Sequence, residues 1–198
     1  LKNLNDFDYE LPEELIALKP KRPRSSSNLL VYQNKTITDS KFFNLVKFLS
    51  IKDRLIFNDT KVLKARLVGT RLRQAASETH KAKVEILLVN QISENVWSAF
   101  CRPLKKISIG DELVFSSSLT ATVLTVATSL CTLQFSKVGF ALQLEISEIG
   151  KLPIPPYIMK RRGYETSDNA DYQTIFAKNL GAVAAPTASL HFDRTLMR

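Results

Sequence analysis

Residues 113–136 read LVFSSSLTATVLTVATSLCTLQFS, an uncharged run of 24 residues in which eleven are Ser, Thr or Gln. Thr120, Thr122 and Thr125 are interleaved with apolar residues, and this alternation is typical of half-buried strands. A membrane-spanning helix needs about 20 predominantly apolar residues, which the polar content of this run excludes. The run therefore predicts β-strands, and we expect no association with a membrane.

Strand-like segments also occur on both sides of this run, and turn signals such as Ile109-Gly110-Asp111 separate them. Short strands at close, regular spacing are typical of a β-barrel or a β-sandwich. We therefore expect an all-β domain over residues 62–149. Its strands are predicted at Val62–Leu72, Lys83–Asn90, Val96–Cys101, Glu112–Phe115, Thr120–Ala127 and Thr132–Phe135.

The flanking segments mix helical and strand signals. Before the β block we expect helices at 11–18 and from Asp39 or Ser40 to about Leu49, strands at 29–32 and 54–57, and a turn at 34–35. After it we expect a proline-rich loop at 152–157, a basic turn at 160–163 and a helix at 172–178. This order predicts an α/β domain, residues 1–61 and 150–198, into which the all-β domain is inserted.

The chain carries a net charge of +9. A basic excess favours an anionic partner, above all nucleic acid, although a lysine-rich surface reflecting genome composition gives the same number. Three basic clusters are candidates for contacts with an RNA backbone, and each also fits a plain solvated face. They are Lys19, Lys21, Arg22 and Arg24; Lys105 and Lys106; and Lys160, Arg161 and Arg162.

Cysteine and histidine are scarce. Cys101 and Cys131 lie in apolar, strand-like contexts, so we expect buried, reduced thiols rather than a disulfide or a metal pair. Two histidines and two cysteines offer no recognised zinc spacing, and we expect no metal. Acidic residues near the start, among them Asp6 and Asp8, argue against a secretory signal. We therefore expect a soluble, cytoplasmic protein.

Two segments carry polar groups suited to a site. Asn58, Asp59 and Thr60 follow a predicted strand, and the carboxyl ends of strands in open α/β sheets are where ligands bind. The same residue types also favour a simple turn after a strand. The second segment, residues 172–192, reads YQTIFAKNLGAVAAPTASLHF and sets polar groups among small residues that permit close approach.

Six stretches, quoted in chain order, together resemble the queuosine-pathway family of S-adenosylmethionine:tRNA ribosyltransferase-isomerases. They are DFDYELPEELIA at 6–17; FNDTKV at 57–62 with Ala65-Arg66-Leu67; KVEILL at 83–88; Trp97 with Arg102-Pro103 and Gly110-Asp111; LPIPPYI at 152–158; and residues 172–192. The resemblance spans nearly the whole chain. It implies an α/β domain carrying an inserted six-stranded barrel.

The resemblance also implies a reaction. The ribosyl moiety of the co-substrate S-adenosylmethionine is transferred to 7-aminomethyl-7-deazaguanine in tRNA and isomerised, giving epoxyqueuosine-tRNA, adenine and methionine. No further cofactor is implied, the expected partners are tRNA and S-adenosylmethionine, and we expect a monomer. Such chemistry needs a base for the ribosyl carbon beside the sulfonium, a donor to the departing adenine and a basic surface for tRNA.

The expected roles follow the matching stretches. Asp59 and His191 are the candidate catalytic residues, although a lone histidine is more often a partly buried structural side chain. Candidate tRNA contacts are Lys105, Lys106, Lys160, Arg161 and Arg162. Candidate substrate contacts are Asn58, Thr60, Arg66, Arg102, Tyr157, Tyr172, Gln173, Pro186, Thr187, Ser189 and Phe192. Among these, the arginines also fit ordinary surface charges, Tyr157 a proline-supported corner, and residues 186–189 a tight helix-entry turn.

Two alternatives stay open. Ser189 stands where the family favours glycine, and the family's His-Val-Gly and Gly-Thr-Phe motifs do not occur in this sequence. These departures fit a truncated, inactive remnant of the enzyme. The basic charge and the β block also fit an RNA-binding β-barrel module without catalysis, which predicts salt-dependent tRNA binding that needs no S-adenosylmethionine.

Overall fold

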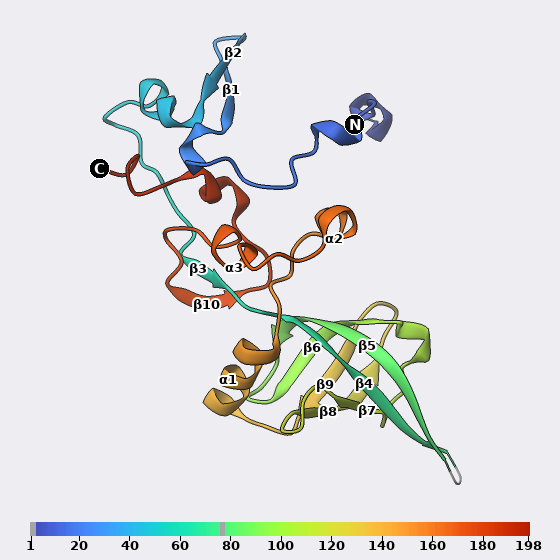
Figure 1. The fold of residues 1–198 in the computed structure, drawn as a ribbon. Coiled ribbons are helices and arrows are strands. Elements are labelled where there is room, and N and C mark those ends of the chain that lie inside the picture. The colour runs from blue at the N-terminus through green and yellow to red at the C-terminus, as the bar shows by residue number, and fades with distance from the viewer. Residues whose placement is uncertain (1–2, 76–77) are drawn as a thin grey trace. The chain divides into compact units, whose positions relative to one another are not determined.

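A computed structural model describes residues 3–75 and 78–198 and divides the chain into two compact units (Figure 1). The first unit comprises Leu1–Leu55, Pro155–Glu165 and His191–Arg198. The second comprises Ile56–Ile154 and Thr166–Leu190. Both units are therefore assembled from segments that lie far apart in the sequence.

A closed, six-stranded antiparallel barrel dominates the second unit (Figure 1). Its strands follow the order β4-β5-β6-β9-β8-β7, and β7 pairs with β4 to close the sheet. The predicted β block and six-stranded barrel are thereby confirmed. The strand bounds are β4 Arg66–Ala75, β5 Glu78–Gln91, β6 Val96–Arg102, β7 Glu112–Val114, β8 Thr120–Val126 and β9 Cys131–Phe135, and a short 3-10 turn, η5, spans Leu104–Lys106.

The barrel interior is filled by the inward-facing residues that alternate along each strand. Leu67, Ile86, Leu88 and Leu133 are completely buried there, and burying each such side chain stabilises the fold by roughly 1.5–3 kcal/mol. Helix α1 (Gly139–Ile149) adds Leu142 and Ile146 to the same core. The sequence did not predict this helix, because its start carries neither a side-chain cap nor an acidic first turn.

Cys101 on β6 and Cys131 on β9 both lie in this interior as free thiols. The two strands are neighbours in the barrel. Burial raises the pKa of both groups, so each thiol stays protonated and behaves as a small apolar residue. The predicted buried, reduced thiols are confirmed.

A two-stranded parallel sheet joins β3 (Thr60–Val62) to β10 (Asn179–Ala182). Between them the chain builds the barrel and α1. The chain enters the barrel at Arg66 and has left it by Lys151. These two residues pair, since Arg66 N donates to Lys151 O at 3.1 Å and Lys151 N donates to Arg66 O at 2.9 Å. The barrel is thus inserted between two paired strands of an α/β element, which confirms the predicted fold class.

The first unit contains a β-hairpin of β1 (Asn28–Gln33) and β2 (Thr36–Lys41). Asn34 and Lys35 both have positive φ, 50° and 63°, as a two-residue hairpin turn requires. The hairpin pairing continues to Lys41, so the predicted helix starting at Asp39 or Ser40 was wrong. Only a 3-10 stretch, η4 (Phe42–Phe48), follows the hairpin.

Other short elements also depart from prediction. The expected helix at 11–18 is a single 3-10 turn, η2 (Glu13–Leu15). The expected strand at 54–57 does not form. The expected basic turn at 160–163 is largely the end of helix α2 (Pro156–Arg162). The expected helix at 172–178 was wrong, since α3 covers Asp168–Asp171 and then ends. The remaining 3-10 elements are η1 Leu4–Phe7, η3 Arg24–Ser26 and η6 Thr187–His191.

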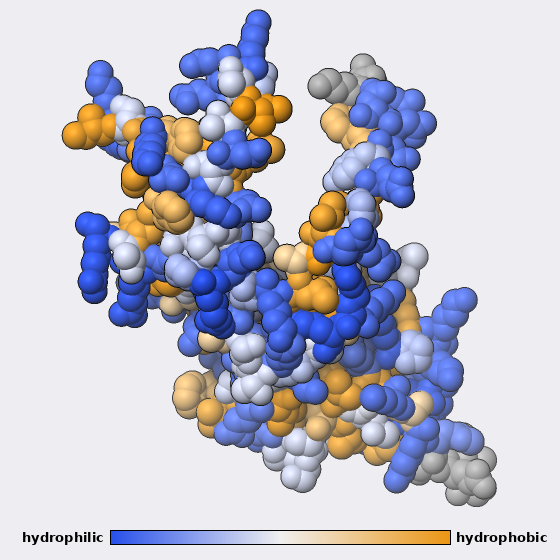
Figure 2. All heavy atoms as spheres, turned by 45° about the horizontal axis from the view of Figure 1, so that its top comes forward, coloured by the Kyte–Doolittle hydropathy of each residue, from blue (hydrophilic) through white to orange (hydrophobic). Residues whose placement is uncertain are grey.

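Apolar residues remain exposed among hydrophilic ones on the surface (Figure 2). In the first unit they include Leu30 and Ile37 of the hairpin, and in the second unit Phe140 and Leu144 of α1. Within residues 3–75 and 78–198, no helix combines the length and the apolar character that crossing a membrane requires.

Two carboxylates of the barrel unit are held ionised by their neighbours. Burial alone would raise the pKa of Asp111, but hydrogen bonds from Arg73 and from the Ser108 backbone lower it below its ordinary value. Glu145 of α1 accepts hydrogen bonds from Lys137, Ser118 and Ser116, which lower its pKa from 4.5 to about 2. Glu145 therefore ties α1 to the loops at the end of the barrel.

This arrangement predicts a pH-dependent stability. Because the folded state lowers the pKa of Glu145, its stabilising contribution is complete above pH 4.5 and is lost as the pH falls toward about 2. Glu145→Gln should lower the melting temperature near neutral pH. The difference in melting temperature between this variant and the unmodified chain should shrink as the pH falls from 4.5 to about 2. Glu148→Gln on the same helix is the control, since Glu148 makes no ion pair with a described residue. A constant difference across this range would contradict the assignment.

Candidate functional site

Asp59 joins the starts of the two parallel strands. Its backbone carbonyl accepts hydrogen bonds from Lys178 N at 2.7 Å and Asn179 N at 3.1 Å. Its carboxylate oxygen Oδ2 accepts a third from Asn179 Nδ2 at 2.8 Å. Asn58 Oδ1 accepts from Thr60 N at 2.8 Å and shapes the turn that leads into β3. Asp59 remains exposed, so its carboxylate is accessible to a ligand.

The turn at residues 58–60 does not lie at the end of a strand, as the sequence predicted. We expected residues 58–60 at the carboxyl end of a strand at 54–57, but that segment pairs with no other strand. The turn lies instead at the amino end of β3. The general rule for ligand sites in open sheets therefore does not apply here, and any role for Asp59 rests on its own contacts.

Gln173 holds the second edge of β3. Its Oε1 accepts from Val62 N at 3.0 Å, and its Nε2 donates to Val62 O at 2.8 Å. The side-chain amide of Gln173 thus makes the two hydrogen bonds with Val62 that the backbone of a neighbouring strand would otherwise make. The adjoining segment is fixed by a stacked ring pair, Phe57 and Phe176, with centroids 4.2 Å apart. Tyr172, at the end of α3, is half-buried.

The segment 186–192 falls in both units. Pro186, Thr187 and Ser189 belong to the second unit, where Ser189 is buried and its N–H donates to Pro186 O at 2.9 Å. His191 and Phe192 belong to the first unit. The two candidate catalytic residues, Asp59 and His191, are therefore carried by different units.

His191 and Phe192 both pack against Phe42 in the first unit. The ring centroids of His191 and Phe42 are 5.3 Å apart, and Phe192 meets Phe42 edge-on at 4.8 Å. Phe192 is buried, whereas His191 is exposed. The carboxylate of the next residue, Asp193, accepts a hydrogen bond from Ser25 N at 3.2 Å. The imidazole is thus held on a packed aromatic base while its ring stays accessible.

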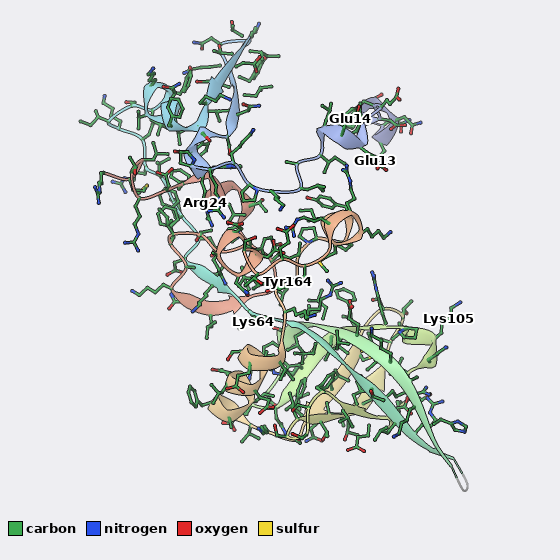
Figure 3. All side chains as sticks on the ribbon, viewed as in Figure 1. Glu13, Glu14, Arg24, Lys64, Lys105 and Tyr164 are labelled. Carbon is green, nitrogen blue, oxygen red and sulfur yellow. The ribbon has the colours of Figure 1, made fainter. Side chains whose placement is uncertain are left out.

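The candidate arginines of the barrel differ in their surroundings. Arg66 makes two contacts to Glu85, 2.9 Å from Nε and 2.8 Å from Nη2, so its charge is largely compensated. Arg102 is exposed at the end of β6, with Lys105 and Lys106 on the following 3-10 turn. Lys105 extends outward from the barrel (Figure 3). These last three side chains form an exposed basic patch.

The basic cluster on α2 is partly used inside the first unit. Arg161 Nη1 donates to Glu13 O at 2.6 Å, and Arg162 Nε donates to Leu18 O at 2.8 Å. The two guanidinium groups thereby tie α2 to the N-terminal segment, whose Glu13 and Glu14 side chains are visible in Figure 3. Tyr157 and Lys160 of the same helix are exposed.

Sequence reasoning missed Asn179, whose amide binds the Asp59 carboxylate. Nothing local marks this residue, because its contact depends on a parallel pairing between distant segments. Sequence reasoning also missed a cavity of about 600 Å³ beside β3 and β10, within the second unit. Its walls come from several separate stretches of the chain, so no single motif predicts it.

Comparison with known proteins places these features in a family context. The sequence model of the queuosine biosynthesis protein family matches residues 4–198. An S-adenosylmethionine:tRNA ribosyltransferase-isomerase of Roseobacter denitrificans is 46% identical over 194 residues, which cover 98% of this chain and 55% of that protein. The enzyme of the same name from Ruegeria sp. is 44% identical over 195 residues, covering 98% and 56%.

Among solved structures, the S-adenosylmethionine tRNA ribosyltransferase from Thermotoga maritima is 32% identical, with a TM-score of 0.36, covering 80% of this chain and 55% of that one. The chain spans about half the length of the curated relatives it matches.

Proposed function

This chain belongs to the queuosine biosynthesis protein family, and from that premise we propose that it forms part of a tRNA-modifying transferase-isomerase. The reaction moves the ribosyl moiety of S-adenosylmethionine onto 7-aminomethyl-7-deazaguanine in tRNA and isomerises it, with release of adenine and methionine. The observation that carries the proposal is the family match over residues 4–198. Relatives of that name at 41–46% identity over 98% of the chain support it.

In this proposal Asp59 takes the proton from the ribosyl carbon beside the sulfonium. The carboxylate is accessible, and its hydrogen bond from Asn179 fixes its orientation, as a positioned general base requires. Asn58 and Thr60 hold the turn that presents it. His191 of the first unit is the second candidate catalytic residue, because its exposed ring on Phe42 can donate or accept a hydrogen bond.

The remaining candidates bind substrates. The exposed basic patch of Arg102, Lys105 and Lys106 offers phosphate contacts for tRNA, together with Lys160 and the arginines of α2. Tyr157 is exposed and available to stack on a base. We keep Arg66, Tyr172, Gln173, Pro186, Thr187 and Ser189 of the second unit, and separately Phe192 of the first unit, as candidate substrate contacts. We further propose a cytoplasmic monomer with the barrel domain spanning residues 62–149.

The test compares this chain with its full-length Roseobacter denitrificans relative. Each protein is incubated with S-adenosylmethionine and tRNA that carries the 7-deazaguanine precursor, and adenine is measured by chromatography. We expect the relative to release adenine only when that tRNA is present. Release of S-adenosylhomocysteine instead would show ordinary methyl transfer and contradict the proposal. Salt-dependent tRNA binding by this chain without adenine release would favour a binding module in its place.

A further inference from the structure

The first unit has almost no hydrophobic core of its own. Among its described residues, Phe42 and Phe192 are the only buried apolar side chains, and their rings meet edge-on at 4.8 Å. All other buried apolar side chains in residues 3–75 and 78–198 belong to the second unit. Burial of two rings offsets the conformational entropy of only a few ordered residues. The first unit therefore needs further apolar contacts to hold a single folded structure.

The β1–β2 hairpin of this unit turns one apolar face to solvent. Side chains alternate between the two faces of a strand, so Leu30 and Tyr32 of β1 point to the same side. Ile37 pairs directly with Tyr32 and shares that side. Leu30, Tyr32 and Ile37 are 64%, 67% and 65% exposed, and we call these three residues the hairpin face. Leu29 and Val31 of the opposite face are half-buried.

Polar groups border the hairpin face at the end away from the turn. Asp39 pairs with Leu30 on the same side, and Lys41 Nζ donates to Asn28 Oδ1 at 2.6 Å. Exposed apolar residues with a polar rim mark interaction sites. Among the described residues, β1 and β2 pair only with each other (Figure 1), and an isolated two-stranded hairpin is at best marginally stable in water. The hairpin therefore needs a further element packed against it.

The 3-10 stretch η4 adds to the exposed apolar surface of the first unit. Phe43 and Val46 lie three residues apart, which is one turn of a 3-10 helix, and they are 48% and 61% exposed. Phe42, beside them in the sequence, is the residue that packs on Phe192. The unit thus contains enough apolar side chains for a core, but many of them face outward.

The relatives of this chain are considerably longer than the part that it matches. The Roseobacter denitrificans relative is matched over 55% of its length and the Ruegeria relative over 56%, so nearly half of each protein has no counterpart here. The family match covers residues 4–198 and so includes the first unit. We propose that this unmatched part of the family protein packs on the hairpin face and completes the core of the first unit. An apolar strand or helix face is the chemistry that fits, because the hairpin face carries no charged side chain.

Amide hydrogen exchange tests whether the hairpin is covered. The 198-residue chain is compared with the full-length Roseobacter denitrificans relative under identical conditions. Amides of β1 and β2 should exchange at least about 100-fold faster in this chain than at the matching positions of the relative, because packing restricts local opening. Amides of the barrel strands β6 and β9 are the internal control and should differ by less than about tenfold. Equal protection of the hairpin in both proteins would overturn the proposal.

A double variant tests the contact itself. Leu30→Ser together with Ile37→Ser should change the melting temperature of the 198-residue chain by less than about 1 °C, because both positions face solvent. Serines at the matching positions of the relative should lower its melting temperature by about 5–10 °C, because two buried apolar contacts are lost. Ile109→Ser, at an exposed position of the barrel unit, is the matched control and should have little effect in either protein. A loss below about 2 °C for the double variant of the relative would refute the contact.

The oligomeric state separates the proposed occupant from a second copy of the same chain. We expect the relative to keep its sedimentation behaviour when the two serines are introduced. A dimer of the relative that dissociates in the double variant would assign the hairpin face to a second copy and overturn the proposal. None of these measurements follows adenine release, so the docking surface and the catalytic proposal can fail independently of each other.

Discussion

Replacing Asp59 with asparagine is expected to lower the rate of adenine release by at least about 100-fold, the usual contribution of a positioned general base. The change is made at the matching position of the full-length Roseobacter denitrificans relative, and the rate is measured with saturating tRNA. Asparagine keeps an oxygen that accepts the hydrogen bond from Asn179 Nδ2, so the β3–β10 junction should survive. The melting temperature should therefore change little.

A matched pair of variants separates the two roles of this side chain. Asp59→Ala removes both the charge and the bond to Asn179, whereas Asn179→Ala removes the bond and leaves the charge. We expect the alanine at 59 to reduce both activity and stability, and the alanine at 179 to reduce stability more than the rate. A rate within threefold of the unmodified enzyme for Asp59→Asn would show that Asp59 only holds the sheet.

Replacing Gly150 with alanine is expected to reduce the free energy of unfolding by about 3 kcal/mol or more, as overpacking against a fixed backbone does. A Cβ at this position would meet Lys64 O at 2.1 Å and Ile146 O at 2.4 Å. Both are backbone oxygens, so neither can move without displacing the β3–β4 connection or the last turn of α1. Urea unfolding of the 198-residue chain measures the loss.

Gly110→Ala is the control for this variant. Gly110 has a φ of +85°, and a Cβ there would have no atom within 4 Å. Its replacement costs only the backbone strain of a left-handed alanine, about 1 kcal/mol. The comparison therefore isolates the steric term at Gly150. If both variants lose equal stability, the close approach of Gly150 to Lys64 is not what fixes α1 against the barrel.

The barrel could be predicted from sequence because its signal is local. In strands such as β6 and β9, buried and exposed residues alternate with a period of two, and the residue pattern carries the same period. Helix α1 was not predicted because it buries only Leu142 and Ile146 and exposes Phe140 and Leu144. Its sequence therefore does not show a single apolar face.

Long-range strand pairing explains why the helix predicted from Asp39 or Ser40 to about Leu49 does not form. Phe42, Leu45, Val46 and Leu49 have helical spacing, but the hairpin register extends to Lys41 and leaves room only for a 3-10 stretch. Short apolar runs are decided by such tertiary pairing rather than by their own periodicity.

The sequence draws attention to single residues of the candidate site but not to the residues that contact them. Asp59 was singled out, yet its partner Asn179 lies 120 positions away and becomes adjacent only through the parallel pairing. Trp97 belongs to one of the matching motifs, but only its folded surroundings show that its buried indole N–H has no hydrogen-bond partner among the described residues. Hydrogen-bond satisfaction is a property of three-dimensional surroundings, and no residue pattern encodes it.

The insertion of the barrel between β3 and β10 has a consequence for the order of folding. Pairing these strands in an unstructured chain would require closure of a very long loop before any contact rewards it. The barrel forms mainly through hairpins between sequence neighbours, such as β4–β5 and β8–β9, which close early. Once Arg66 and Lys151 pair at its base, the effective loop shrinks to the short segments outside the barrel. The folded barrel thus holds the segments that carry β3 and β10 close together, and we expect β3–β10 pairing to be a late step in folding.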